Sequence, residues 1–150
     1  MLKKLDLPPL WLLLFGALGW ASDQYFHVDL SLSHPITDFL AAVLLGGGVI
    51  LIALAVVEMR QKGAALHPHE TGDVLVTSGI FKRSRNPIYL AYLLILAGFL
   101  LCFDTILALP LVPIFLWLVE NRFVIQEEKA LRRKFRADFA RYCQRTRRWI

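Results

Sequence analysis

Apolar residues are gathered into four long stretches, and polar segments separate them. The stretches cover residues 7–23, 36–59, 87–103 and 105–125. They lack the alternation of a membrane β-strand. A helix that crosses a hydrocarbon core of about 30 Å needs roughly 20 residues, so the second and fourth stretches are long enough and the first and third are short. Because backbone groups in lipid must be satisfied internally, we expect four membrane-spanning helices.

Composition supports this interpretation. Hydrophobic residues make up 57% of the 150 residues, and the mean hydropathy is +0.53, both above what is typical of a water-soluble domain. We therefore predict an all-α fold in which residues 1–150 form one integral membrane bundle of four transmembrane helices, followed by an amphipathic C-terminal helix. The two cysteines, Cys102 and Cys143, are expected to be free thiols.

Basic residues are unevenly distributed along the chain. Residues 121–150 contain ten Lys or Arg against three acidic residues, although the whole chain carries a net charge of only +5. Loop 60–86 and the N-terminus are also basic, whereas residues 22–35 contain no Lys or Arg. The positive-inside rule predicts that both termini and this loop are cytosolic. We expect the protein to lie in a prokaryotic inner membrane. We interpret the helical tail, residues 126–150, as lying on anionic lipid headgroups, which is more economical than nucleic-acid binding.

The polar entry to the third stretch is the first candidate site. Asn86 followed by Pro87 is typical of a helix start. Arg85, just before that start, is suited to a carboxylate or phosphate, and the ring of Tyr89 is suited to a cation. An ordinary membrane entry, with Arg85 at the headgroups and Tyr89 in the aromatic belt, is an equally weighted alternative.

A second candidate site lies at the end of the fourth stretch. An unpaired carboxylate is costly at the position of Glu120, and its predicted partners are the next residues, Asn121 and Arg122. Glu127 and Glu128 lie about 100° apart on a helix, so we expect one to bind a ligand and the other to pair with a neighbour such as Arg132. Solvated charges that balance a basic helix are the alternative for both.

The two candidate sites are predicted to converge. A tight turn at Asp104 folds the third and fourth stretches into an antiparallel hairpin, which returns the Glu120–Glu128 end of the chain to the Arg85–Tyr89 end. A metal site at His67-Pro68-His69-Glu70 is not predicted, because the proline prevents the helical i, i+4 spacing and neither cysteine is near.

The motifs and their order resemble a known family. They are Gly79-Ile80-Phe81, Arg85-Asn86-Pro87-Ile88-Tyr89, a hydrophobic hairpin, Glu127-Glu128, and a tail with Phe135, Tyr142, Arg147, Arg148 and Trp149. Over roughly its last 85 residues the chain resembles the isoprenylcysteine carboxyl methyltransferases, which share this region with the phospholipid N-methyltransferases. Asn86 departs from the pattern, which often has histidine there. Since asparagine does not titrate near neutral pH, we expect it to position rather than to act as a base.

This resemblance implies transfer of a methyl group from S-adenosylmethionine to a lipophilic or lipid-anchored acceptor that enters from the bilayer. The implied cofactor-binding residues are Val76, Gly79, Phe81, Arg85, Asn86, Pro87, Tyr89, Leu90, Glu127 and Glu128. The implied catalytic residues are Arg85, Tyr89, Glu120 and Arg122. An isoprenylcysteine-like carboxylate and a lipid amine stay open as acceptors.

Two other functions also fit the pattern. A related membrane reductase would bind a nicotinamide cofactor at similar hairpin ends, although this chain is short for a dinucleotide. A non-enzymatic four-helix adaptor would use the basic tail to recruit lipid or protein, and substitution of Glu127 or Glu128 would leave its function intact.

Overall fold

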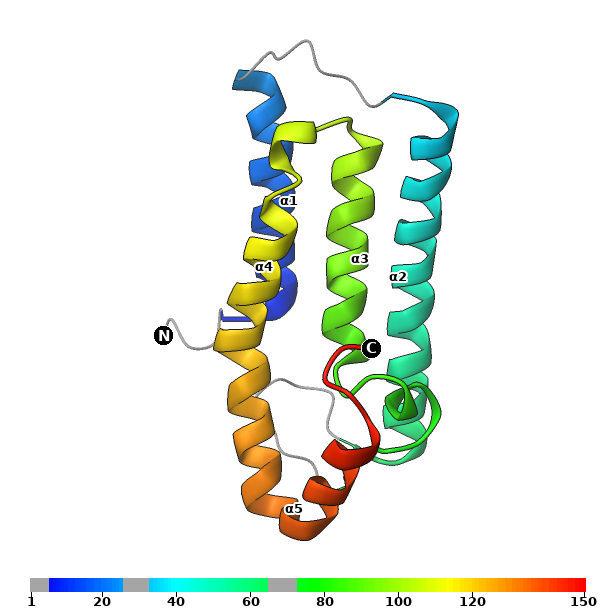
Figure 1. Cartoon of the computed structure of the whole chain (residues 1–150), viewed down its shortest axis with the longest axis vertical. Coiled ribbons are helices and arrows are strands. Elements are labelled where there is room, and N and C mark those ends of the chain that lie inside the picture. Colours follow the sequence, from blue (N-terminus) through cyan, green and yellow to red (C-terminus); the bar gives the residue numbers. More distant parts are fainter. Residues whose placement is uncertain (1–5, 26–32, 65–72) are drawn as a thin grey trace. The chain divides into compact units, whose positions relative to one another are not determined.

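All regular secondary structure in the described part of the chain is helical (Figure 1). The computed structural model describes residues 6–25, 33–64 and 73–150, so the His67–Glu70 motif lies outside the described residues. The helices are α1 (Pro8–Tyr25), α2 (Pro35–Gln61), η2 (Gly79–Lys82), α3 (Pro87–Cys102), η3 (Ile106–Ala108), α4 (Leu111–Val119), η4 (Glu120–Val124) and α5 (Ile125–Arg145). The helical prediction is confirmed, and α1 to α3 lie within two residues of the first three predicted stretches.

The fourth predicted stretch is not one continuous helix, contrary to expectation. A short 3-10 turn, η3, precedes α4, and a π-helical turn, η4, separates α4 from α5. Pro110 and Pro113 lie in this region, and a proline has no backbone N–H for an interior helical bond. The predicted turn is present: α3 ends at Cys102, Asp104 has a positive φ of 54°, and the Thr105 N–H donates to the Leu100 carbonyl at 3.0 Å.

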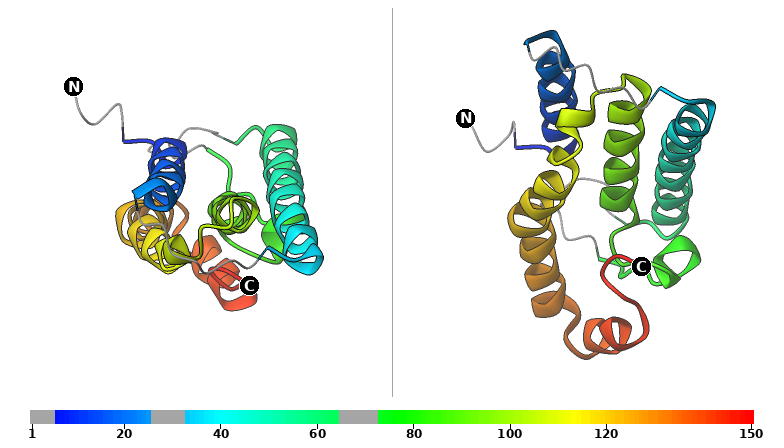
Figure 2. Two further views of the ribbon diagram at one scale, coloured as in Figure 1. Left: turned by 90° about the horizontal axis from the view of Figure 1, so that it is seen from above. Right: turned by 45° about the horizontal axis from the view of Figure 1, so that its top comes forward.

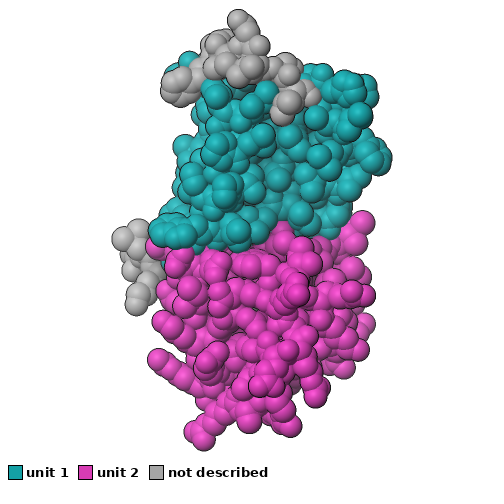
Figure 3. Space-filling view, viewed as in Figure 1, with its two compact units in different colours: residues 1–49, 91–118 teal, residues 50–90, 119–150 magenta. Residues whose placement is uncertain are grey.

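The chain divides into two compact units (Figure 3). Unit 1 comprises Met1–Val49 and Ala91–Leu118, and unit 2 comprises Ile50–Leu90 and Val119–Ile150. Each is described by itself, and the prediction of a single membrane domain stays a prediction. All the candidate site residues lie in unit 2.

In unit 1, α3 packs closely against α2 (Figures 1 and 2). A Cβ at Gly98 would stand 2.9 Å from the Ala41 carbonyl oxygen and 2.9 Å from the Leu45 nitrogen. Gly48 is equally close to the third-stretch backbone, since its Cβ would meet the Ala91 carbonyl oxygen at 2.9 Å. The glycines therefore allow close helix approach. Gly48 is the member of the Gly46–Gly48 triplet that makes such a contact, whereas a Cβ at either of the other two would meet no described atom within 4 Å.

The other face of α3 in unit 1 packs against α1. A Cβ at Gly19 would stand 2.2 Å from the Leu100 side chain and 3.4 Å from that of Ala108 in η3. Phe15 of α1 meets Phe115 of α4, with ring centroids 5.2 Å apart. α3 thus lies between α1 and α2, and small residues line both contacts.

The outer surface of unit 1 is rich in large apolar side chains. Leu13 is 68% exposed, Phe39 71% and Trp117 67%, which is typical of helices that face lipid. Two stretches of the described residues, Pro35–Gln61 and Ile106–Arg145, are long and apolar enough to cross a membrane, and the shorter α3 is also apolar. The full arrangement of four spans stays a prediction.

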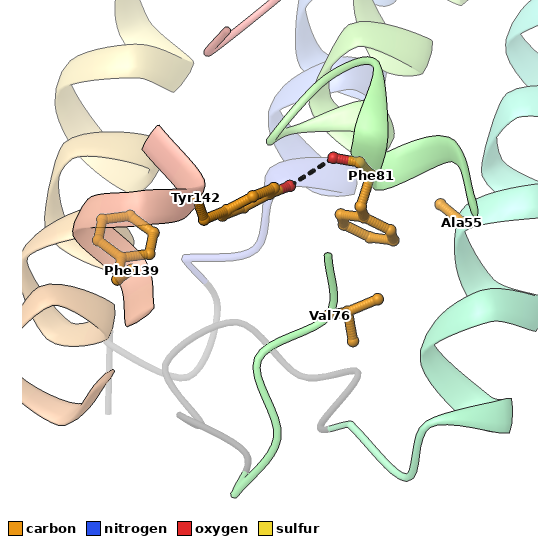
Figure 4. Close-up of a cluster of buried hydrophobic side chains, with 5 residues drawn as sticks. All are labelled: Ala55, Val76, Phe81, Phe139 and Tyr142. Atoms are coloured by element: carbon orange, nitrogen blue, oxygen red, sulfur yellow. Dashed lines mark hydrogen bonds between the residues drawn. The ribbon is translucent and has the colours of Figure 1, made fainter. Parts of the chain in front are cut away.

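Unit 2 is built around a small apolar core from three regions of the chain (Figure 4). Its buried members are Ala55, Val76, Phe81, Phe139 and Tyr142. α5 contributes the last two because the helix changes direction at Arg136, whose backbone is non-helical with φ 40° and ψ −107°. The tail is therefore not the uninterrupted helix over residues 126–150 that the sequence predicted. The helix in this tail is kinked, and the helix ends at Arg145.

Candidate active site

Three charged side chains form the centre of the site in unit 2. Arg85 Nη2 donates to Glu128 Oε1 at 2.9 Å. Arg148 donates to the same carboxylate twice, from Nε to Oε1 at 3.1 Å and from Nη2 to Oε2 at 2.7 Å. The side chains of Arg85 and Glu128 are each 13% exposed, so this carboxylate is a buried anion between two guanidinium groups. The predicted partner of the Glu127-Glu128 pair was Arg132, but Glu128 pairs with Arg85 and Arg148 instead.

The neighbouring glutamate makes a different contact. The Tyr89 hydroxyl donates to Glu127 Oε1 at 2.5 Å, and the Tyr89 ring stacks near that of Phe123 with a centroid distance of 6.3 Å. Phe123 and Glu127 thus both contact Tyr89. These contacts and the Arg85–Glu128 ion pair confirm the predicted convergence of the two candidate sites.

The chain's C-terminal segment, residues 142–148, is hydrogen-bonded along the segment that leads into α3, residues 81–86. The backbone N–H of Arg85 donates to the Arg147 carbonyl at 3.0 Å, and Arg85 Nη1 donates to the Thr146 carbonyl at 3.1 Å. The Tyr142 hydroxyl donates to the Phe81 carbonyl at 2.7 Å (Figure 4). Two segments separated by about 60 residues are therefore joined by hydrogen bonds next to the charged cluster.

The start of α3, which the sequence marked at Asn86-Pro87, is buried under the C-terminal segment. Asn86 is 9% exposed, and Pro87 is among the fully buried side chains. The Arg148 carbonyl accepts hydrogen bonds from Asn86 Nδ2 and Ser84 Oγ, each at 3.2 Å. The Leu90 N–H donates to the Asn86 carbonyl at 3.0 Å and so begins the helix.

The loop before α3 is held by a residue that the sequence did not single out. Gly79 has a φ of +57°, and a Cβ there would stand 2.3 Å from Glu58 Oε2 of α2. The Ser78 hydroxyl donates to Glu58 Oε1 at 2.5 Å. Two of the implied cofactor-binding residues, Val76 and Phe81, are each 9% exposed and belong to the unit 2 core.

Glu120 and Arg122 lie together in the π turn η4. Glu120 accepts a hydrogen bond from Arg148 Nη1, so the same arginine joins two carboxylates. Its predicted partners were its sequence neighbours, and the structure pairs it with Arg148 instead. Arg122 is exposed.

Burial and charge act in opposite directions on Glu128. Burial by itself raises the pKa of the Glu128 carboxyl, but hydrogen bonds and positive charge from Arg148 and Arg85 outweigh burial and lower that pKa below its ordinary value. The hydrogen bond to Glu128 also raises the pKa of the Arg148 guanidinium. At the edge of the site, burial raises the pKa of the Tyr142 phenol, so the hydroxyl keeps the proton that it donates to Phe81. All three groups thus hold the protonation states that these hydrogen bonds require at neutral pH.

Arg148 is the residue that prediction from sequence missed. It was named only among the tail residues of the family pattern and was given no role in the site, because its two partners lie 20 and 28 residues earlier and the intervening helix bends at Arg136. Its position next to Trp149 at the end of the tail was the one available signal, through the family pattern.

In the described residues, apolar side chains cover the outer surface of unit 1 and a charged cluster lies in unit 2, a combination typical of membrane-associated proteins. The family model described as "Phospholipid methyltransferase" matches residues 36–138. The chain belongs to this family, whose activity is methyl transfer to a lipid-type acceptor. No curated protein and no protein of known structure matches the chain.

Proposed function

We propose that the cluster in unit 2 binds S-adenosylmethionine and that the protein transfers its methyl group to a lipophilic acceptor at the cytosolic membrane face. Family membership favours this function over the nicotinamide reductase and the adaptor, which the sequence left open. The observation that carries the proposal is the joining of Tyr89 to Glu127 and of Arg85 to Glu128 in one cluster.

The charge of the cluster suits this cofactor. Its contacts involve two arginines, Arg85 and Arg148, and three carboxylates, Glu120, Glu127 and Glu128, so it offers groups of both signs. S-adenosylmethionine carries a sulfonium, an ammonium and a carboxylate, and therefore one net positive charge. A site with groups of both signs can pair the ligand carboxylate with a guanidinium and the cationic groups of the ligand with a carboxylate.

One buried donor also fits the cofactor. The Nε of Arg85 is buried and has no hydrogen-bond partner among the described residues, although the other guanidinium nitrogens are engaged. A buried donor without an acceptor costs about 1–3 kcal/mol. A ligand carboxylate at this edge of the guanidinium would supply the missing acceptor.

The remaining roles follow from side-chain chemistry. Glu127 is suited to ribose hydroxyls or the amine, and the electron-rich face of Tyr89 is suited to a sulfonium. Glu128 is already surrounded by two guanidinium groups, so we assign it to holding the site together and Glu127 to the ligand. The cofactor supplies an activated methyl group, and the residues contribute chiefly by aligning the acceptor with it and by excluding water.

We place the acceptor near the π turn, with Glu120 and Arg122 as its candidate ligands. The basic loop and tail of unit 2 suit the cytosolic side of the membrane, and a lipophilic acceptor would enter from the bilayer. Unit 2 exposes many basic side chains, among them Lys82, Arg83, Arg132, Arg133 and Arg136, which favour contact with anionic headgroups.

Purified protein incubated with methyl-labelled S-adenosylmethionine and a total lipid extract tests this function. We expect label in a lipid product whose identity names the acceptor. Absence of label from every lipid, together with no binding of S-adenosylhomocysteine by calorimetry, would contradict the proposal.

A further inference from the structure

The π turn η4 changes which residues of the following helix lie in line with Glu120. Glu120 and Glu128 are eight residues apart, and on a regular α-helix they would lie about 80° apart around the axis. A π turn accommodates one additional residue. The pair then has the spacing of seven regular residues, which places the two side chains about 20° apart, on one face of the helix.

The guanidinium of Arg148 binds both of the aligned carboxylates. Arg148 binds Glu120 through Nη1 and Glu128 through Nε and Nη2, so all its nitrogens are engaged by two carboxylates of the same helix face. Such forked bonding is specific to arginine, because the lysine ammonium is a point charge. Without the π turn, Glu120 would lie off this face and Arg148 would hold a single carboxylate.

The same arginine ends the C-terminal segment. Its carbonyl accepts from Ser84 and Asn86, and the preceding carbonyl accepts from the Arg85 N–H. The side chain of Arg148 therefore anchors to α5 the backbone that covers the start of α3.

We propose that Arg148 is a positioning residue, which uses the carboxylate pair aligned by the π turn to hold the C-terminal segment and Glu128 in place around the cofactor end of the site. This inference rests on the proposed function for its effect on cofactor binding. Its structural part, the attachment of the C-terminal segment, does not depend on any ligand.

A double-mutant cycle with S-adenosylhomocysteine as the probe tests the link to the cofactor. We expect Arg148→Gln to weaken binding about tenfold, Glu128→Gln to weaken it similarly, and the double variant to be no weaker than the worse single variant, because contacting residues are not additive. Arg148→Lys should be intermediate. The matched control is Arg145→Gln, which removes an exposed charge three residues away and should stay within twofold of wild type. Additive losses, or wild-type affinity in Arg148→Gln, would overturn the proposal.

Hydrogen exchange of the peptide that carries Arg85 tests the structural part separately. Arg148→Gln should accelerate exchange of the Arg85 amide at least tenfold, whereas Arg145→Gln should leave it within twofold. Glu120→Gln and the swap Glu120→Asn with Asn121→Glu should accelerate it equally, because the swap moves the carboxylate about 100° off the Arg148 face. Wild-type exchange in Arg148→Gln or in the swap would overturn the assignment. If wild-type protein binds no S-adenosylhomocysteine, the proposed function fails, and this exchange measurement still decides the role of Arg148.

Discussion

Substitution Glu127→Gln separates the ligand-binding carboxylate from the one that holds the site together. The Tyr89 hydroxyl donates to Glu127 Oε1 at 2.5 Å, and a glutamine carbonyl oxygen keeps an acceptor there while removing the negative charge. The cluster then loses one negative charge. A hydrogen bond to a charged group contributes about 1.5–3 kcal/mol, so we expect S-adenosylmethionine to bind about 10- to 100-fold more weakly.

Calorimetry on protein in lipid nanodiscs provides the measurement. Asp138→Asn is the matched control, since it removes a carboxylate from the same helix at an exposed position paired with Arg141. We expect that variant to bind as wild type does. Melting temperatures of the two variants should agree within a few degrees, because Glu127→Gln preserves the acceptor. Equal affinities of Glu127→Gln and wild type for S-adenosylmethionine would refute the assignment of Glu127 to the ligand.

Three further predictions concern stability. Gly79→Ala should lower the melting temperature more than Gly63→Ala, because both glycines have positive φ but a Cβ collides with Glu58 at Gly79 and meets no described atom within 4 Å at Gly63. Equal decreases in melting temperature for the two variants would count against the loop packing. Arg136→Gly should raise the free energy of unfolding by about 1 kcal/mol, because glycine tolerates the φ of 40°. Arg133→Gly, in regular helix, should lower the free energy of unfolding by a similar amount. Chemical unfolding in which both variants are less stable than wild type would contradict the kinked backbone at Arg136. Because the pKa of Glu128 is lower in the folded protein, the stabilisation by its pairing with Arg85 and Arg148 is complete above the ordinary glutamate value of about 4.3 and is lost as the pH falls through the folded pKa. Between pH 6 and pH 3 the melting temperature should therefore fall less steeply for Glu128→Gln than for wild type. Parallel decreases in the two proteins would refute this linkage.

Local signals predicted the elements and the pairing of the two clusters. Asn86-Pro87 marked the start of α3, and Asp104 marked its turn. The hairpin between them brought Tyr89 to Glu127, as two antiparallel segments of similar length joined by a tight turn require. Hydrophobic patterns and turn residues reflect interactions between residues that are close in the sequence, so they can be recognised in a single sequence.

The path of the chain beyond Val119 could not be predicted in the same way. The π turn and the kink at Arg136 are departures from helical regularity in a segment whose composition favours a plain helix. They depend on tertiary contacts, among them the two carboxylates that share Arg148 and the Tyr142 hydroxyl on the Phe81 carbonyl. Each joins residues 20 or more positions apart, and residue spacing alone gives no signal for such contacts. For the same reason the burial of the α3 start was missed.

Photolabelling with methyl-labelled S-adenosylmethionine, followed by peptide mapping, tests the central claim most directly, because it locates the cofactor without reference to any acceptor. The account predicts label in peptides that contain Tyr89 or Glu127, suppressed by excess S-adenosylhomocysteine and strongly reduced in Glu127→Gln. Label confined to peptides of α1 or of the first half of α2, competed equally well, would show that the cofactor binds elsewhere and would contradict it.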